Sequence, residues 1–369
     1  MTISRKVLLE SLKKAMPGIE NGNQTLQGAD AFIFHDGKIF TYNDSIAVSI
    51  PLEIEGLVDE GIDGAVHADE FFKILSKFSA DEINFTVAEN DSWLLKCGKA
   101  KIGMNLMEFD FEERLKGVTP DSNKKSWTKL PEDFIECIGT CKILGNKTPM
   151  SGIYFEGNYV VSTDGFQINR YTLETELPKF WISDNSAAEL LKFTNIKEIQ
   201  LQENWVHFKT DDGSIFSIKT LDSSKFPMEK MMQLMDTSKP KEDDLNATFP
   251  EELFNAIDRA ETFAMNINDH AAIRMVLSPE KIEITSERQS GNYAEKVAWD
   301  KDFKSKFEPI TLYVDPAMVS FIAKRSLKFY LSKVTSPKTG KIIPRFMFVS
   351  DKSQHMMTTF SAKEKAKEK

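Results

Sequence analysis

The sequence contains few of the patterns that mark membrane-spanning, disulfide-rich or metal-binding proteins. Its 369 residues include only three cysteines, Cys97, Cys137 and Cys141, which cannot all pair, so we expect buried thiols and no metal site. No apolar run approaches the roughly 20 residues that span a bilayer. The first residues do not read as a signal peptide. We therefore expect a cytoplasmic protein that has no membrane partner.

Signatures of catalysis are also missing. The five histidines fall in different predicted elements, and none lies beside a nucleophile and an orienting acid. The chain has no glycine-rich phosphate loop, no nucleophile elbow and no His-Glu-x-x-His motif. We expect a protein that is not an enzyme and uses no cofactor. An enzyme with Asp164 in a cleft is the alternative, although Thr163-Asp164 and Asn43-Asp44 read as strand-end turns.

The charge balance is acidic, with 56 acids, 47 bases and a net charge of −9. Such a balance argues against nucleic acid as a partner, but a phosphate backbone responds to the local field of one face. The predicted helices and their ends carry bases on their polar sides: Lys6, Lys13, Lys14, Lys73, Lys77, Lys142, Lys192, Arg259, Lys324 and Arg325. These bases form either one basic face or a set of ordinary solvated faces.

What the chain does contain is one pattern repeated three times. An amphipathic helix, two strands around a tight turn, a second helix and further strands recur at intervals of about 120 residues. The strand pairs are predicted at 31–44, 152–164 and 272–287, and the helices at 5–16, 131–141, 250–260, 67–77, 184–192 and 315–325. A repeat of this length is a whole domain. We predict domains at 1–125, 126–245 and 246–361, followed by a charged tail at 362–369.

One segment of the middle copy has a recognisable sequence. It reads Val160-Val-Ser-Thr-Asp-Gly-Phe-Gln-Ile-Asn-Arg-Tyr171 and resembles the Ala-Thr-Asp-Gly-(His or Tyr)-Arg-Leu-Ala segment of the bacterial β sliding clamp, the processivity subunit of DNA polymerase III. Leu221-Asp-Ser-Ser-Lys-Phe-Pro227 and Val66-His-Ala-Asp-Glu-Phe-Phe-Lys-Ile-Leu75 resemble two further segments of that family. The matches stay in register to about residue 360. The chain is thus similar to the clamp family, and a viral member is one possibility.

The resemblance implies an α+β DNA-clamp fold with three similar domains, each with two inner helices packed on antiparallel sheets. Two chains would close head to tail into a ring around duplex DNA, with sequence-independent contacts to phosphate. The implied function is a processivity factor in DNA replication. Lys147 falls where the family has DNA-facing residues, although its loop, 145–149, is shorter than usual and lacks the family's tyrosines. The alternative is a clamp-fold interaction platform that does not encircle DNA.

The resemblance also implies a pocket that binds a short linear peptide of the polymerase or the clamp loader. Its walls, carried over by position, are Met150, Thr163, Gly165, Phe166, Gln167, Ile168, Pro227, Met232, Met356 and Thr358. Methionine side chains repack at little cost, which suits a receptor for several peptides. Gln167 replaces the family's arginine and the last residues differ from the family's ending, so we expect an altered specificity.

Ring closure implies a homodimer in which the first domain of one chain meets the last domain of the other. By position, Ile102 and Met104 lie on one side of this interface, and Thr262 and Phe263 on the other. Thr262 is smaller and more polar than an aliphatic residue, so it buries less apolar area. We expect a dimer that dissociates at low concentration.

Overall fold

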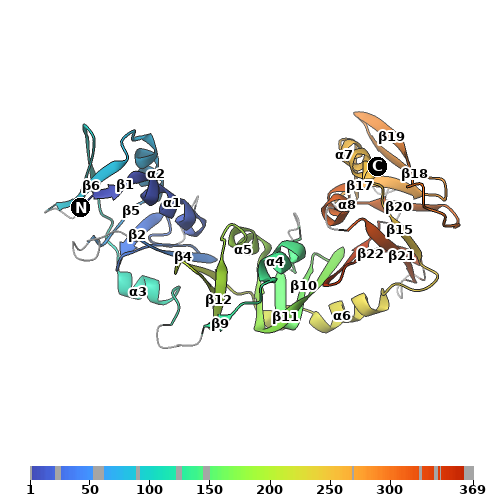
Figure 1. The fold of residues 1–369 in the computed structure, drawn as a ribbon, viewed down its shortest axis with the longest axis horizontal. Helices are drawn as coiled ribbons and strands as arrows, with labels where there is room; N and C mark the ends of the chain where they lie inside the picture. Colours follow the sequence, from blue (N-terminus) through green and yellow to red (C-terminus); the bar gives the residue numbers. More distant parts are fainter. Residues whose placement is uncertain are drawn as a thin grey trace. The chain divides into compact units, whose positions relative to one another are not determined.

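The computed structural model describes most of the chain and forms two compact units. The described residues are 2–20, 26–52, 62–88, 92–121, 127–143, 150–267, 270–323, 326–335, 340 and 342–360. The first unit comprises Met1–Ile135 with Leu177–Ser223, and the second comprises Glu136–Glu176 with Ser224–Lys369. Both combine antiparallel sheets with short helices, as the predicted α+β class requires (Figure 1). No helix in the described part of the chain is long and apolar enough to span a membrane.

The first unit contains two antiparallel sheets. The eight-stranded sheet has the order β5-β2-β3-β4-β14-β13-β12-β9, and the four-stranded sheet has the order β1-β6-β7-β8. The strands are β1 Thr2–Ser4, β2 Ala31–His35, β3 Lys38–Tyr42, β4 Ile46–Pro51, β5 Gly64–His67, β6 Glu82–Ala88, β7 Ser92–Cys97, β8 Ala100–Asn105, β9 Thr128–Lys129, β12 Ile196–Leu201, β13 Trp205–Thr210 and β14 Ile215–Lys219. Strand β4 pairs with β14, so the larger sheet contains strands from both sides of the predicted domain boundary at 125. The predicted boundaries stay predictions.

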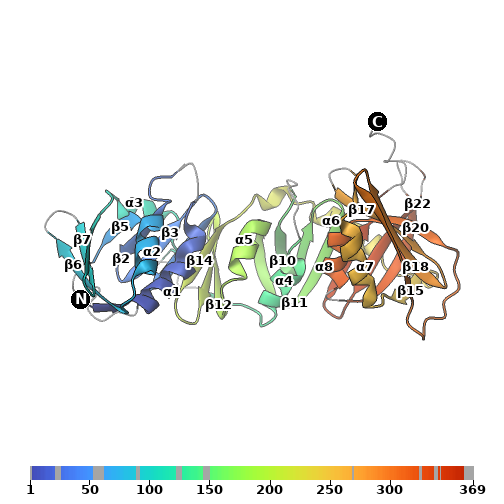
Figure 2. The ribbon, with the colours of Figure 1, turned by 90° about the horizontal axis from the view of Figure 1, so that it is seen from above.

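Two helices of the first unit lie side by side over its strands: α1, Arg5–Ala15, and α2, Ala68–Lys77 (Figure 2). Apolar residues spaced three and four apart give each helix one buried face. The Ser4 side chain caps α1 by accepting a hydrogen bond from the backbone N–H of Val7, 3.5 Å away. The remaining helices of this unit are α3 Phe111–Lys116, α5 Asp184–Leu190 and the 3₁₀ turns Met16–Gly18 and Ser223–Lys225, of which the last ends in the second unit.

Aromatic side chains make up much of the core beneath α2. The ring of Phe71 lies with its centroid within 6.5 Å of the rings of Phe32, Phe34, Phe85 and Trp93. Most of these contacts are edge-on, a geometry that contributes about 0.5–1.5 kcal/mol per pair beyond the buried area. The Phe-Phe helix of the first domain is therefore held by a packed aromatic cluster.

The second unit contains the other two sheets. The six-stranded sheet has the order β10-β11-β23-β22-β21-β15; in the other, β16-β17-β18-β19 are consecutive and β20 also pairs with β17. The strands are β10 Ile153–Thr163, β11 Gln167–Ile182, β15 Leu245–Thr248, β16 Met265–Ile267, β17 His270–Leu277, β18 Lys281–Arg288, β19 Gly291–Ala298, β20 Ile310–Val314, β21 Lys328–Thr335, β22 Ile342–Val349 and β23 Ser353–Thr358. The helices are α4 Phe134–Cys141, α6 Met228–Thr237, α7 Glu252–Glu261 and α8 Pro316–Ala323. Both α4 and β11 cross from one unit to the other.

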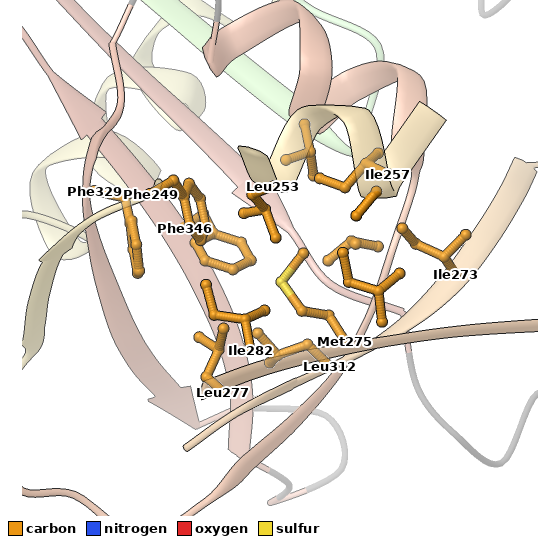
Figure 3. Packing of buried hydrophobic residues seen from close by; sticks show 14 of the residues in the cluster. Phe249, Leu253, Ile257, Ile273, Met275, Leu277, Ile282, Leu312, Phe329 and Phe346 are labelled. Atoms are coloured by element: carbon orange, nitrogen blue, oxygen red, sulfur yellow. The ribbon is translucent and has the colours of Figure 1, made fainter. Parts of the chain in front are cut away.

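The core of the second unit lies under α7 and α8, which pack against each other. Figure 3 shows Leu253 and Ile257 of α7 close to Met275 of β17, all of them fully buried. Phe249 stacks on Phe329 with ring centroids 4.0 Å apart. Burying one such side chain contributes about 1.5–3 kcal/mol, so this cluster supplies much of the unit's stability.

The six predicted helices are confirmed as α1, α2, α4, α5, α7 and α8, with ends that differ by at most three residues; the end predicted for the last one, at 325, lies outside the described residues. The first hairpin is confirmed, with Asp36 and Gly37 at positive φ in the turn, and so is the third, β17–β18. The turn predicted inside 152–164 is wrong. Those residues form the single strand β10, in which Gly157 has φ 63°, and the chain turns after it at Asp164-Gly165.

Candidate functional site

The turn that joins β10 to β11 is built around a buried carboxylate. Oδ1 of Asp164 accepts hydrogen bonds from the backbone N–H groups of Phe166, at 2.8 Å, and Gln167, at 2.9 Å. Its Oδ2 accepts a third from Nε2 of Gln167 at 2.8 Å, and Asp164 is fully buried. Gly165 occupies the left-handed region at φ 91°. The predicted strand-end turn is confirmed, and its carboxylate holds the backbone of the turn in place.

Strand pairing brings two distant parts of the predicted peptide pocket together. In the β11–β23 ladder, Ile168 lies opposite Met356 and Gln167 opposite Met357. The backbone N–H of Thr358 donates to the carbonyl oxygen of Phe166 at 2.9 Å. Predicted pocket residues of 163–168 and 356–358 are thus neighbours, although almost two hundred residues separate them in the sequence.

The predicted pocket residues differ in exposure. Four of them lie beneath the accessible part of the pocket, because each is at most 4% exposed: Thr163, Gln167, Ile168 and Met356. The others are exposed or half-buried: Met150, Gly165, Phe166, Pro227, Met232 and Thr358. The accessible part of the predicted pocket therefore comprises the turn, the start of α6 and the end of β23.

An arginine that sequence reasoning did not select lies on the same face as Ile168. Arg170 follows Ile168 by two positions on β11, and residues two apart in a strand point to the same face. Its guanidinium lies 3.8 Å from Sδ of Met232, 2.5 Å from Oε1 of Gln354 and 3.5 Å from Oδ1 of Asp236. The period-two alternation of β11 was the signal that could have identified it.

A second overlooked arginine, Arg345, lies on β22 opposite Thr358. Nη1 of Arg345 donates to Oγ of Ser238 at 3.1 Å and lies 4.0 Å from Sδ of Met356. Its Nε is buried and has no hydrogen-bond partner among the described residues. Burial also lowers the pKa of Arg345 below its ordinary value. No sequence motif marked this residue, because β22 meets β23 only in the folded protein.

The predicted DNA-facing bases are mostly exposed, and four of them pair with carboxylates. The pairs are Lys14–Asp212 at 3.0 Å, Lys73–Asp69 at 2.5 Å, Lys192–Glu189 at 2.7 Å and Arg259–Glu295 at 2.7 Å. Three others, Lys6, Lys13 and Lys77, are exposed and form no ion pair with any described residue, and Lys142 is half-buried. The predicted contacts Lys147, Lys324 and Arg325 lie outside the described residues.

Three of these bases line one cavity of the first unit. Lys13 and Lys14 of α1 and Lys192 after α5 border a space of about 350 Å³, together with Asp212 and Ser214. Burial raises the pKa of Asp212, but hydrogen bonds from Thr210, Ser214 and Lys14 outweigh it and hold that pKa well below its usual range. The cavity is therefore lined by lysine ammonium groups and by a carboxylate that is ionised at neutral pH.

The predicted dimer residues lie at the last strands of two sheets. Ile102 and Met104 are half-buried on β8, the end strand of the four-stranded sheet. Thr262 ends α7 and is exposed, whereas Phe263 is half-buried. A Cβ added at Gly291, the first residue of the end strand β19, would lie 2.7 Å from the Phe263 ring. Each predicted pair thus lies on or beside a strand with one unpaired edge in the described sheets.

The three cysteines lie in the core. Cys97, Cys137 and Cys141 are all buried, as predicted, and none of them forms a disulfide. Within the described ranges, no group of three or more His, Cys, Asp or Glu side chains is arranged to hold a metal ion.

Comparison with known proteins gives a clear result at the level of structure and none at the level of sequence. No family model matches the chain, and no curated protein matches it. Among solved structures, it is similar to the DNA polymerase sliding clamp of Bacillus subtilis, with 17% identity, a TM-score of 0.74 and 98% of each chain covered. The DNA polymerase III β chain of Streptococcus pneumoniae gives 17% identity and a TM-score of 0.77 over 98% of this chain and 99% of that one.

A sliding clamp of Bartonella birtlesii, solved with griselimycin bound, matches with 16% identity and a TM-score of 0.75. It covers 98% of this chain and 99% of its own. At such low identity the likeness establishes the fold, and function has to be argued from the residues. The protein has the fold of the bacterial β sliding clamps.

Proposed function

We propose that the protein is a DNA sliding clamp, a homodimeric ring that encircles duplex DNA and tethers a replicative polymerase. The observation that carries this proposal is the fold, which is similar to those clamps along almost the whole chain. That similarity covers 98% of this chain. The proposed activity is mechanical and involves no catalysis, cofactor or metal. It belongs in the cytoplasm, with the replicating DNA.

The distribution of charge supports a weak, mobile contact with DNA. Exposed lysines on α1 and α2 attract phosphates without reading base edges, so binding is independent of sequence. Four of the predicted DNA-facing bases already have a carboxylate partner, which reduces what each can contribute to a phosphate. Retention on DNA would then depend on closure of the ring more than on affinity.

Ring closure is proposed to occur between β8 of one copy and β19 of another. Each is the end strand of its described sheet and has a row of backbone groups that no described strand pairs. Ile102 and Met104 beside one edge and Phe263 beside the other supply apolar area. Pairing of two such edges between copies would satisfy the backbone and bury these side chains together.

The peptide site is proposed at the accessible part of the predicted pocket. Met232 offers an adaptable apolar contact there, the half-buried Phe166 adds a ring that packs on His270, and the Asp164 turn holds the backbone of this segment in place. A polymerase or clamp-loader segment of the Gln-x-x-Leu-Phe kind would bind at this surface. Tethering by a short segment lets different partners exchange at one site.

The deciding experiment is retention on circular DNA. The purified protein is loaded onto nicked circular DNA by a clamp loader, separated from unbound protein, and the DNA is then cut once. Release on cutting is the expected result, because a closed ring can leave only over a free end. Retention that survives cutting would indicate ordinary DNA binding. Failure to load at all would favour the interaction platform, which the net charge of −9 also suits.

A matched pair of variants ties this experiment to the ring. Met104→Asp places a charge at the end strand β8 and is expected to leave the protein monomeric and unable to stay on DNA. Thr86→Asp adds the same charge at an exposed position of β6, an inner strand of the same sheet, and is expected to load normally. Sedimentation at micromolar concentration gives the oligomeric state of each variant.

A further inference from the structure

A cavity of about 390 Å³ lies in the second unit, on the face of the six-stranded sheet opposite Ile168 and Arg170. Its floor is a row of three residues on neighbouring strands. Asn169 of β11 lies opposite His355 of β23, which in turn lies opposite Phe348 of β22. Successive side chains of a strand point to opposite faces, so this row and the predicted peptide site lie on the two sides of the sheet. The cavity is therefore separate from that site.

Two helices line this cavity with residues of their C-terminal ends. Thr140 lies in the last turn of α4, Ile322 lies in the last turn of α8, and Ser326 follows α8. The backbone N–H of Ser326 donates to the carbonyl oxygen of Ile322 at 3.1 Å, which keeps this segment close to the end of α8. The C-terminus of a helix carries the negative end of its dipole, equivalent to roughly half an elementary charge. Two such ends beside one cavity favour a positively charged ligand.

Asn169 gives the cavity a buried acceptor that no described group uses. Its side chain is 1% exposed, and Nδ2 donates a hydrogen bond to the carbonyl oxygen of Thr140. A carbonyl oxygen can only accept, so this bond determines which end of the Asn169 amide faces α4. Oδ1 is buried and has no hydrogen-bond partner among the described residues. An unpaired buried acceptor is unfavourable, so a ligand N–H at Oδ1 would stabilise the protein.

A carboxylate adds a negative charge at the same place. Glu136 lies one helical turn before Thr140, so the two residues are neighbours on one face of α4. The Glu136 side chain is exposed, lines the cavity and forms no ion pair with any described residue. None of the described residues that line the cavity is a lysine or an arginine. The helix ends, the free Oδ1 and this carboxylate thus all favour a cationic hydrogen-bond donor.

We propose that this cavity binds a small aliphatic ammonium ion, of which a short diamine is the simplest bidentate form. One ammonium group donates to Oδ1 of Asn169, and the second lies beside the carboxylate of Glu136. The methylene chain between them packs on the buried side chains of Ile322 and Phe348. The inference goes beyond the proposed function and needs neither a closed ring nor DNA.

Binding of putrescine, a four-carbon diamine, to the full chain tests the inference. Its saturation-transfer NMR signal is titrated in phosphate buffer, which contains no competing amine. Salt at about 150 mM screens diffuse attraction to the protein's net charge of −9. A Kd of about 1 mM is expected for so small a ligand. The four-carbon diol keeps the hydrogen-bond donors without the charge and should bind at least about tenfold more weakly.

Variants at the two acceptors assign the binding to this cavity. Glu136→Gln removes the exposed carboxylate at constant size and should weaken putrescine binding about tenfold. Asn169→Leu removes the buried acceptor and should abolish saturable binding. If Asn169→Leu folds poorly, Glu136→Gln keeps the test decisive, because an exposed position tolerates the change. Glu252→Gln is the matched control: it removes the same charge from the first turn of α7, outside the cavity lining, and should leave the Kd unchanged.

Three results would overturn the inference. A Kd that neither Glu136→Gln nor Asn169→Leu changes would show that the diamine is a diffuse counter-ion of an acidic protein. Equal binding of the diamine and the diol would show that charge plays no part. Absence of saturable binding to the unmodified protein, well above the expected Kd, would leave the cavity without this ligand. Retention on circular DNA tests the proposed function separately, so the two can fail independently.

Discussion

The charged residues of the helix surfaces and those of the β11–β23 region differ in exposure and in what they stabilise. On the helices, Lys14, Lys73, Lys192 and Arg259 are exposed, and each lies beside a carboxylate. In the sheet, Asp164 is fully buried, and its carboxylate accepts three hydrogen bonds that restrain Phe166 and Gln167. Exposed pairs are replaceable because water competes for each partner, whereas buried groups determine the geometry because nothing else can satisfy them.

The largest expected effect comes from removing the buried acid. Asp164→Ala leaves two backbone N–H groups and the Gln167 amide without their acceptor, and hydrogen bonds to a charged group contribute about 1.5–3 kcal/mol each. We expect the free energy of unfolding to fall by at least about 3 kcal/mol, together with peptide binding. Denaturant unfolding measures the change in the free energy of unfolding. Asp44→Ala, at the matching but exposed position of the first repeat, is the control and should change little.

A buried histidine extends the comparison to pH. His207 is fully buried between Ser217 and Gln202, and burial lowers the pKa of His207 from 6.5 to about 4. At a pH between these two values, His207 binds a proton in the unfolded chain but not in the folded protein. Stability should therefore fall as pH drops from about 6.5 to about 4, by about 2–3 kcal/mol, and His207 should add no further loss below that. Unfolding curves of His207→Gln should show a shallower decline in this window.

An exposed pair should affect DNA binding more than it affects stability. Asp212→Asn releases Lys14 from its partner, so the affinity for duplex DNA should rise about two- to fivefold, and the dependence of log K on log salt should steepen by up to about 0.9. Titration of labelled duplex at several salt concentrations measures both. Glu174→Gln removes the Glu174–Lys352 ion pair, which involves no predicted DNA contact, and should leave both quantities unchanged.

The smallest effect is expected at α2. Lys73 pairs with Asp69 one turn away, and both side chains are mostly exposed. Lys73→Ala should change the free energy of unfolding by less than about 0.5 kcal/mol, since exposed pairs of this spacing contribute little. A loss as large as that of Asp164→Ala would contradict the contrast between exposed and buried charges. Thermal unfolding of Lys73→Ala, compared with the unmodified protein, measures this change.

Parts of the fold could be predicted where the signal is local. Six helices were predicted because apolar residues three and four apart imply one buried face, whatever that face packs against. The Asp164 turn could be predicted because an Asx side chain bonds to backbone only two or three residues away. The turn inside 152–164 was misplaced because Gly157, which resembles a turn residue, lies within a continuous strand.

The sequence by itself determined the repeated pattern of helices and strands, the buried thiols and the resemblance to a clamp, since each depends on neighbouring residues or on their spacing. Only the tertiary structure decided which residues share the peptide surface. Arg170 and Gln354 meet because β11 pairs with β23, and Arg345 reaches Thr358 because β22 pairs with that same strand. Strand register is set by long-range pairing, so no local pattern could reveal that Arg170 pairs with Asp236 whereas Arg345 pairs with no carboxylate among the described residues.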